Sequence, residues 1–145
     1  MHANYSDVLA SALTLQKAIT AFAAAPSAQG LEDAKNAWLA AREFYGQTEV
    51  FRFYSGPIDD DKGPEGRLNA WPLDESYIDS VVGKPKSGIV NNPKIKINKA
   101  NLAKLNERGG EENIAAGWHA IEFLLWGQDL SCLLYTSDAA DERSS

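Results

Sequence analysis

Cysteine and histidine are scarce in this sequence. Cys132 is the only cysteine among 145 residues, and His2 and His119 are the only histidines. A single thiol excludes a disulfide framework within the chain and a zinc site built from several cysteines. Any metal site would therefore take most of its remaining ligands from carboxylates.

Basic residues are few and dispersed. Lysine and arginine total 14 against 20 aspartates and glutamates, for a formal net charge of -6 at pH 7, and no block of basic residues occurs. Proteins that bind nucleic acid present a basic patch or stripe. The composition therefore excludes nucleic acid as an expected partner.

Long apolar runs are also missing. No segment approaches the roughly 20 apolar residues that a membrane-spanning helix needs. The first residues, MHANYSDVLASA, lack the basic and then apolar pattern of a secretory signal. We expect neither a transmembrane helix nor a signal peptide in this chain.

What the sequence does contain is enough apolar residues, 44%, for one domain with a core of its own. Between Tyr5 and Phe22 they recur at alternating spacings of three and four residues, which predicts a helix with one buried stripe. A second helix is predicted from Leu31 to Tyr54, after a break at Pro26.

The second predicted helix carries two neighbouring lines of side chains. The expected core line consists of Ala34, Ala37, Ala41, Phe44, Thr48 and Phe51. Beside it runs a line of alternating aromatic and charged residues: Trp38, Arg42, Tyr45, Glu49 and Arg52. This second line is either a solvated ladder of ion pairs or, because it borders the core, part of a functional site.

The middle of the chain predicts loops and short helices. Residues 55–70 and 84–97 are rich in turn-forming residues and are expected to be loops, with a weak strand pattern at 95–97. A helix of about three turns is expected between Pro72 and Gly83, with Asp74 and Glu75 at its positive end. Asn98 is expected to cap a further helix that ends near residues 109–110, and a last helix is expected over residues 111–126.

His119 and Glu122 lie three positions apart in the last predicted helix, on one line with Trp126. An imidazole and a carboxylate at this spacing project side by side and could bind one zinc, iron or manganese ion. Glu49 is the best candidate for a third ligand because it lies on the polar line of the second helix. The alternative is a hydrogen-bonded pair that only stabilises the helix.

The segment GWHAIEFLLWGQD, residues 117–129, resembles the signature of the imelysin-like family, Gly-x-His-x-x-Glu, here Gly117, His119 and Glu122. Three further segments resemble the family in the same order: AWLAAREFYGQTEVFRF, SGPID and GPEGRLNAWPLDESYIDSV. Together the four segments cover most of residues 5–131.

The resemblance implies an all-α protein made of two helical-bundle halves, of which this chain is the first. It implies a bacterial cell-envelope location, in the periplasm or anchored by lipid at the outer membrane. It also implies a metal or ligand site formed by His119 and Glu122, with Gly117 and Trp126 in the same motif. By position in the shared segments, Glu49, Arg52 and Asp74 would be neighbours of that site.

Family members are classed as metallopeptidases, and relatives belong to iron-uptake systems. Zinc hydrolysis needs about three protein ligands, an open coordination position and a general base. If Glu122 is a ligand it cannot also be the base, so Glu49 would have to serve. We therefore expect a metal-binding protein linked to iron acquisition, with bound iron or zinc; a zinc endopeptidase acting on extracytoplasmic polypeptides and a metal-free scaffold or ligand-binding module are the alternatives.

The resemblance stops near Ser131. Residues 132–145, CLLYTSDAADERSS, look like translated adapter sequence, so we expect a domain of residues 1–131 followed by a foreign tail. The expected partners are the missing C-terminal half of the protein and either iron-uptake components or a peptide ligand.

Overall fold

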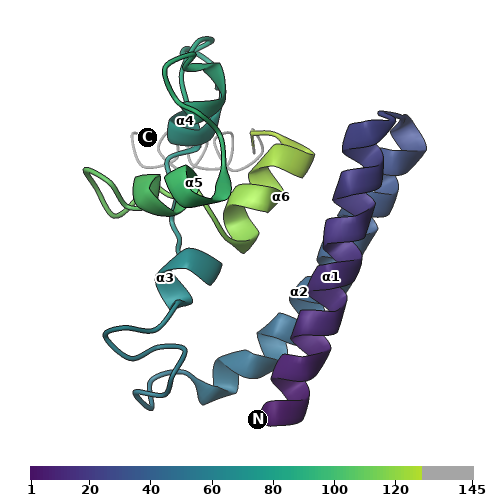
Figure 1. Ribbon diagram of the computed structural model, residues 1–145, viewed down its shortest axis with the longest axis vertical. Coiled ribbons are helices and arrows are strands. Elements are labelled where there is room, and N and C mark those ends of the chain that lie inside the picture. Colours follow the sequence, from purple (N-terminus) through teal and green to yellow (C-terminus); the bar gives the residue numbers. More distant parts are fainter. Residues whose placement is uncertain (129–145) are drawn as a thin grey trace, which may run out of the picture.

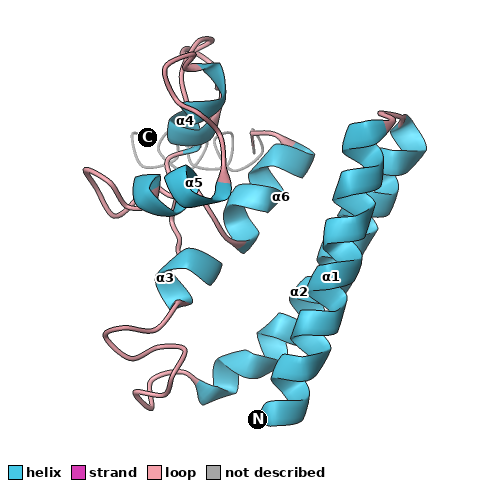
Figure 2. Ribbon diagram, viewed as in Figure 1, coloured by secondary structure: helices cyan, strands magenta, loops and turns pink. Residues whose placement is uncertain are grey.

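The computed structural model describes residues 1–128, and this part of the chain is all-α, as expected. Figure 2 shows helices joined by loops, without strands in the described residues. Only an isolated bridge joins Val81 and Lys84, and the weak strand pattern at 95–97 does not form a strand. The expected foreign tail, residues 132–145, lies outside the described residues and stays a prediction.

Two long helices, α1 (His2–Ala24) and α2 (Ala28–Thr48), form an antiparallel hairpin along one side of the molecule (Figure 1). Both helices were predicted. At the tight connection the side chain of Ser27 caps α2 by accepting a hydrogen bond of 3.0 Å from the Gly30 amide. After α2 the chain continues as a short 3-10 helix, η1 (Glu49–Phe51), so the predicted helical segment extends nearly to its expected end.

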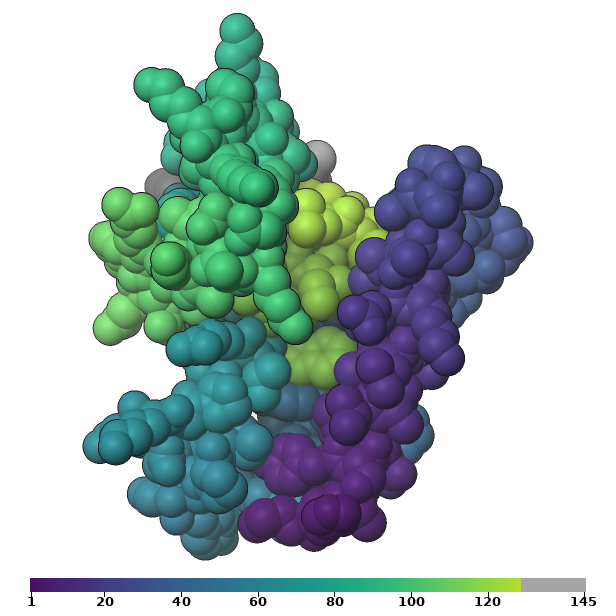
Figure 3. All heavy atoms as spheres, in the orientation of Figure 1, coloured from purple at the N-terminus to yellow at the C-terminus, as the bar shows by residue number. Residues whose placement is uncertain are grey.

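The shorter elements are α3 (Glu65–Leu68), α4 (Glu75–Ile78), η2 (Ile89–Asn91), α5 (Lys99–Leu105) and α6 (Trp118–Trp126). Helix α6 lies between the α1–α2 hairpin and the group formed by α3, α4 and α5 (Figure 1). In the space-filling view its atoms are visible between α1 and the segment that leads into α5 (Figure 3). Helix α6 is thus the central element that joins the two sides.

The core forms where α6 packs on the hairpin. Ala34, Ala41 and Thr48 of the expected core line of α2 are buried, but the buried face extends beyond that line. The buried members of the core are Leu15, Trp38, Ala41, Tyr45 and Trp118. Trp38 and Tyr45 were expected beside the core but are 6% and 3% exposed, whereas Phe44, expected in the core, is 39% exposed. Because α6 covers α2 on the Trp38 side, the buried face is turned toward that line.

For three segments in the middle of the chain, the predicted length of the loop or helix is wrong. The expected loop 55–70 contains α3, and the expected three-turn helix after Pro72 is reduced to the single turn of α4. Helix α4 stops at Asp79, whose backbone is extended and whose carboxylate accepts a hydrogen bond of 2.8 Å from the side-chain Nδ2 of Asn91. Helix α5 begins at the expected cap, with Asn98 accepting from the Asn101 amide at 2.9 Å, but ends at Leu105, before the two glycines.

The last helix begins later than predicted, at Trp118 instead of Glu111. The backbone before it forms tertiary hydrogen bonds: the Glu112 carbonyl accepts from the Asp74 amide at 2.8 Å, and the Asn113 carbonyl accepts from the Glu107 amide at 2.7 Å. These partners hold residues 112–113 against α4 and the turn after α5. The acidic pair at 111–112 therefore lies in a turn and does not start the helix.

None of the helices within residues 1–128 combines the length and the apolar character needed to cross a membrane.

Candidate functional site

The structure places His119 and Glu122 side by side on the first two turns of α6. The imidazole Nδ1 lies 3.1 Å from Glu122 Oε2, and the two side chains are 22% and 45% exposed. The other ring nitrogen, Nε2, is buried and has no hydrogen-bond partner. One ring nitrogen of the imidazole is therefore held by a carboxylate, while the other is buried and has no partner among the described residues.

Gly117, the first residue of the motif, allows α6 to approach α3 closely. Its φ is +96°, in the region that favours glycine. A Cβ atom built there would lie 2.6 Å from the Leu68 carbonyl oxygen and 2.9 Å from that of Arg67. Any side chain at this position would collide with the backbone of α3, so the glycine sets the position from which His119 projects.

Trp118 fixes α6 to α2. Its carbonyl oxygen accepts a buried hydrogen bond of 3.0 Å from the Trp38 indole. Its ring centroid lies 6.4 Å from that of Trp38 and 5.4 Å from that of Tyr45. His119, the next residue, thus starts from a rigid part of the backbone.

Glu49, expected as the third ligand, is held elsewhere. Its Oε1 lies 3.5 Å from Arg42 Nη2 and accepts a long hydrogen bond of 3.4 Å from Asn69 Nδ2. Within residues 1–128, no three histidine, cysteine, aspartate or glutamate side chains gather as a metal site. The structure therefore brings together two of the three expected ligands, and Glu49 is not with them.

The other expected neighbours have structural partners of their own. Arg52 Nη2 pairs with Glu65 Oε1 at 3.0 Å. Asp74 caps α4, accepting hydrogen bonds from the Ser76 amide at 2.9 Å and the Ser76 hydroxyl at 2.6 Å. Trp126 packs edge-on against Trp38 at 5.4 Å. The contacts of Asp74 are those of a residue that caps the start of a helix, and they need no functional role to explain them.

A polar cluster at the end of α2 was only partly foreseen. Burial raises the pKa of Tyr45 to about 12; Glu65 and Glu49 act in the same direction, and Arg42 and Arg52 oppose them. One nitrogen on each arginine, Arg42 Nη1 and Arg52 Nε, is buried without a hydrogen-bond partner. The polar line on the second helix was the sequence signal for this cluster.

Asn69, just after α3, was missed. It is only 1% exposed, and its Oδ1 has no hydrogen-bond partner. A buried acceptor without a partner costs about 1–3 kcal/mol, so such a group is expected to have a use. The sequence offered no signal for it, because residues 55–70 were predicted to be a loop.

These contacts decide how far the described residues fit a metal ion. A ligating histidine commonly binds the metal through one ring nitrogen while a carboxylate holds the other. His119 and Glu122 have the carboxylate–imidazole half of this arrangement, and Nε2 is the ring nitrogen without a partner. One imidazole with its carboxylate partner fits a part of a transition-metal site, and residues 1–128 do not supply a complete one.

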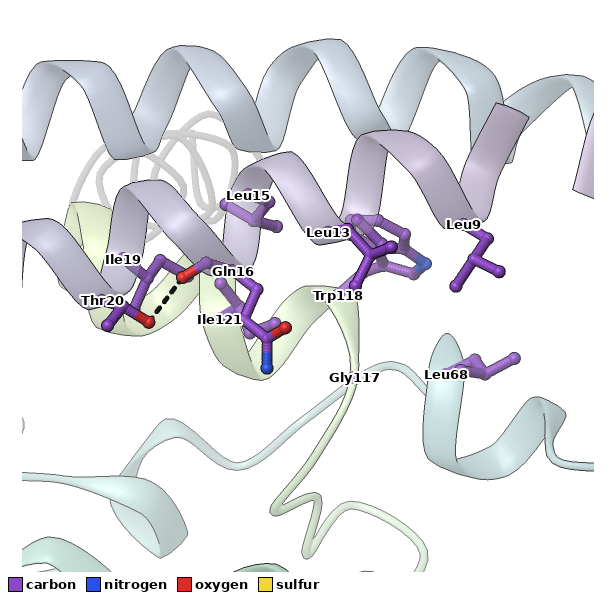
Figure 4. A pocket seen from close by; sticks show the side chains of 11 residues that line it. Leu9, Leu13, Leu15, Gln16, Ile19, Thr20, Leu68, Gly117, Trp118 and Ile121 are labelled. Atoms are coloured by element: carbon purple, nitrogen blue, oxygen red, sulfur yellow. Dashed lines mark hydrogen bonds between the residues drawn. The ribbon is translucent and has the colours of Figure 1, made fainter. Parts of the chain in front are cut away.

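A separate apolar cavity of about 430 Å³ lies between α1 and α6 (Figure 4). Leu9, Leu13 and Ile19 line it from α1, and Ile121 lines it from α6. Thr20 donates its hydroxyl proton to the Gln16 carbonyl at 2.7 Å, so this hydroxyl is already satisfied within α1. The cavity offers apolar surface and few polar groups, and it contains no metal ligand.

Two comparisons place the chain among known proteins. The model of the imelysin peptidase family matches residues 1–144. The iron-regulated protein A of Synechococcus elongatus is 37% identical over 82 residues. That match covers 57% of this chain and 22% of the relative, so the matching segment corresponds to about a fifth of the relative's length. Because the family model matches almost the whole chain, this protein belongs to the imelysin family.

Proposed function

We propose that this chain contributes His119 as a ligand to a transition-metal site in a bacterial cell-envelope protein that serves iron acquisition. The observation that carries the proposal is the buried, unpartnered Nε2 of His119, on an imidazole whose Nδ1 is held by Glu122 at 3.1 Å. Membership of the imelysin family and the match to a protein named for iron regulation support the link to iron.

The geometry gives Glu122 a different role from that of a second ligand. Its Oε2 is within hydrogen-bonding distance of Nδ1, where it orients the ring and fixes its tautomer. His119 would then bind the metal through Nε2. A bound ion would supply a positive centre for holding the cargo or ligand, and the protein would supply the orientation of the ring.

The remaining ligands would come from outside the described residues. The C-terminal half of the family fold is the proposed source, and it would close the site over α6. Iron-uptake components or a peptide ligand are the proposed partners of the assembled protein. Anchoring in the periplasm or at the outer membrane is part of the same proposal.

Hydrolysis by zinc receives less support from the contacts. The general base of a peptidase must reach the water that it activates. Glu49, the expected base, is held by Arg42 and Asn69, and Glu122 is engaged with His119. We therefore rank metal binding above peptide cleavage.

The deciding experiment is a metal-content and competition measurement on the full-length protein with iron, zinc, copper and manganese offered together. The variants are His119→Ala and, as a matched control, His2→Ala, which removes the only other histidine, an exposed one. We expect stoichiometric metal in the wild type and in His2→Ala, and loss of metal in His119→Ala with unchanged helix content. Equal metal content in both variants would refute the proposed ligand.

A second variant separates the possible roles of Glu122. Loss of an orienting carboxylate typically costs about 10- to 100-fold in metal affinity. Glu122→Gln should therefore weaken binding without abolishing it. Chelator-sensitive cleavage of an unfolded polypeptide by the wild type, lost in this variant, would instead favour the peptidase.

A further inference from the structure

The segment that contains the loop between α4 and α5 is positively charged, although the chain as a whole is acidic. Six of the nine lysines lie within residues 80–106, and this segment contains no aspartate or glutamate. The remaining residues carry 20 acids and only eight lysines and arginines. Because no two of the six lysines are adjacent, they form no basic run, and the separation of charge is visible only over the whole segment.

The first part of this segment projects from the body of the molecule. After α4 the chain forms a lobe that contains η2 and then returns to α5 (Figure 1). In the space-filling view this lobe, coloured teal to green, is the uppermost part of the molecule (Figure 3). We call residues 80–98 the basic loop; its lysines, all exposed, are Lys84, Lys86, Lys94 and Lys96.

The lysines of the basic loop are not neutralised by acids of the same chain. None of them forms an ion pair within residues 1–128. Lys84 Nζ donates to a neutral group, the Ser76 hydroxyl, at 3.2 Å. Asp79, the acid next to the loop, uses its Oδ1 to accept from the Ser80 amide at 2.6 Å and from Asn91 Nδ2 at 2.8 Å. The positive charge of the loop therefore faces solvent.

Three large aliphatic side chains of the basic loop are exposed as well. Val82 is 75% exposed, Val90 47% and Ile97 54%. Single exposed apolar residues are ordinary on a protein surface, but here they occur among unpaired lysines in one projecting loop. The interface of a membrane accommodates both groups, because lysine ammonium groups stay at the lipid phosphates while aliphatic side chains enter the acyl boundary.

Internal contacts hold the basic loop in shape. Ile89 of η2 is only 6% exposed, and Gly88, with φ of +93°, lies so close to Ile78 that a Cβ atom would collide with its backbone. The Val82 amide donates to Gln128 Oε1 at 2.9 Å. The Lys96 carbonyl accepts from the side chain of Asn101 at 2.8 Å. Both ends of the loop are thus fastened, and its exposed side chains belong to a defined surface.

We infer that the basic loop binds the surface of a membrane that contains anionic phospholipid. Its four lysines lie at the phosphate groups, and the side chains of Val82, Val90 and Ile97 enter the head-group region. The charge of the loop selects an anionic partner. The exposed aliphatic side chains favour lipid over a soluble polyanion, which offers no apolar phase in which to bury them.

The strength of such binding follows from the number of lysines. One lysine close to an anionic membrane raises the partition constant about fivefold. This attraction decays over a Debye length, about 10 Å at 0.1 M salt, so binding should weaken as salt is added. The acidic remainder of the chain is repelled by the same surface, which orients the protein with the basic loop toward the lipid.

The test is co-sedimentation of the full-length protein, produced without lipid modification, with vesicles. One set contains phosphatidylcholine mixed with phosphatidylglycerol, and the other contains phosphatidylcholine alone. We expect salt-sensitive binding to the mixed vesicles and binding to the neutral vesicles that is at least about tenfold weaker. Removing two charges of the loop, by Lys94→Gln together with Lys96→Gln, should lower the partition constant roughly 20-fold.

Lys17→Gln together with Lys62→Gln is the matched control. It removes two exposed lysines that form no ion pair within residues 1–128 and lie outside the basic loop. Binding should stay within about twofold of the wild type. No binding to the mixed vesicles would overturn the inference, and so would equal losses in the two lysine double variants.

Val82→Ser and Ile97→Ser test the apolar contribution without a change of charge. Both side chains are more than half exposed, so helix content should stay the same while each variant binds the mixed vesicles severalfold less tightly. Serine variants that bind as tightly as the wild type would overturn the assignment to lipid. Binding of dextran sulfate would then show that the loop recognises a soluble polyanion.

This inference goes beyond the metal-site proposal and does not depend on it. The basic loop does not include His119, so the variant His119→Ala should bind the mixed vesicles as the wild type does. Loss of metal from that variant with unchanged vesicle binding would separate the two properties.

Discussion

The indole nitrogen of Trp38 donates a buried hydrogen bond of 3.0 Å to the carbonyl oxygen of Trp118, a residue 80 positions further along the chain. This bond joins α2 to the first turn of α6, immediately before His119. It also explains why the α2 line that contains Trp38 faces the core. The orientation of the histidine motif therefore depends on a contact that lies outside the motif.

Removing this contact should loosen α6. The variant Trp38→Phe loses the indole donor and leaves space in the core, and we expect it to lower the free energy of unfolding by about 1–3 kcal/mol. Urea denaturation followed by circular dichroism measures the change. Trp126→Phe is the control: Trp126 is 42% exposed and packs on the same ring, so its replacement should cost clearly less. If both variants lost the same free energy of unfolding, the hydrogen bond from Trp38 would not be what holds α6 against α2.

Gly117→Ala should destabilise the protein by at least about 2 kcal/mol, because φ of +96° is strained for alanine and the added Cβ would meet the α3 backbone. Gly46→Ala is the matched control. Gly46 lies within α2 and a Cβ there meets nothing within 4 Å, so alanine should stabilise the helix by about 0.5–1 kcal/mol. Thermal or urea unfolding of the two variants should shift in opposite directions. Unfolding shifts of the same sign would argue against the close approach of α6 and α3.

Tyr45 should make stability depend on alkaline pH. Burial, together with Glu65 and Glu49, raises its pKa from 10.0 to about 12 in the folded protein. Between these values the folded state keeps the phenolic proton that the unfolded state has lost, so this contribution is complete below about pH 10 and disappears as the pH rises to about 12. Urea unfolding across this range should show a decline that Tyr45→Phe reduces.

A titration of tyrosine absorbance gives the companion measurement. Replacing Glu65 with glutamine removes a charge that raises the pKa of Tyr45 and releases Arg52, which lowers it. Glu65→Gln should therefore lower the pKa of Tyr45. The titration step of Tyr45 is identified as the one that disappears in Tyr45→Phe. A higher pKa of Tyr45 in Glu65→Gln would contradict the assigned electrostatic causes.

The backbone conformation of Glu107 offers a test of strain in the turn after α5. Glu107 occupies the position after the α5 cap with φ of +61°, a left-handed conformation in which glycine is favoured. Glu107→Gly should raise the free energy of unfolding by about 0.5–1 kcal/mol, which urea denaturation measures. Glu107→Gln is the control for charge: it keeps the backbone strain at this exposed position and should leave the free energy of unfolding within about 0.5 kcal/mol of the wild type. A glycine variant that is less stable than the wild type would show that the Glu107 side chain holds the turn in place.

The sequence by itself determined the elements whose signals are local. The spacing of apolar residues predicted α1 and α2, because helical hydrogen bonds link residues four positions apart and the buried stripe follows the same period. Asn98 marked the start of α5 because a cap bonds to an amide three residues away. The three-residue spacing of His119 and Glu122 likewise placed them side by side on α6.

Only the tertiary structure decided that Trp38 and Tyr45 of α2 are buried, where α6 begins and what Glu49 contacts. Each depends on partners distant in the sequence: Trp118 against Trp38, the Glu112 carbonyl against Asp74, and Asn69 beside Glu49. A short helix gains little from its own hydrogen bonds, so its limits follow the packing around it. A polar cavity lined by Glu65, Glu107 and Glu111 arises in the same way, because these residues become neighbours only when α3 and the turn after α5 pack together.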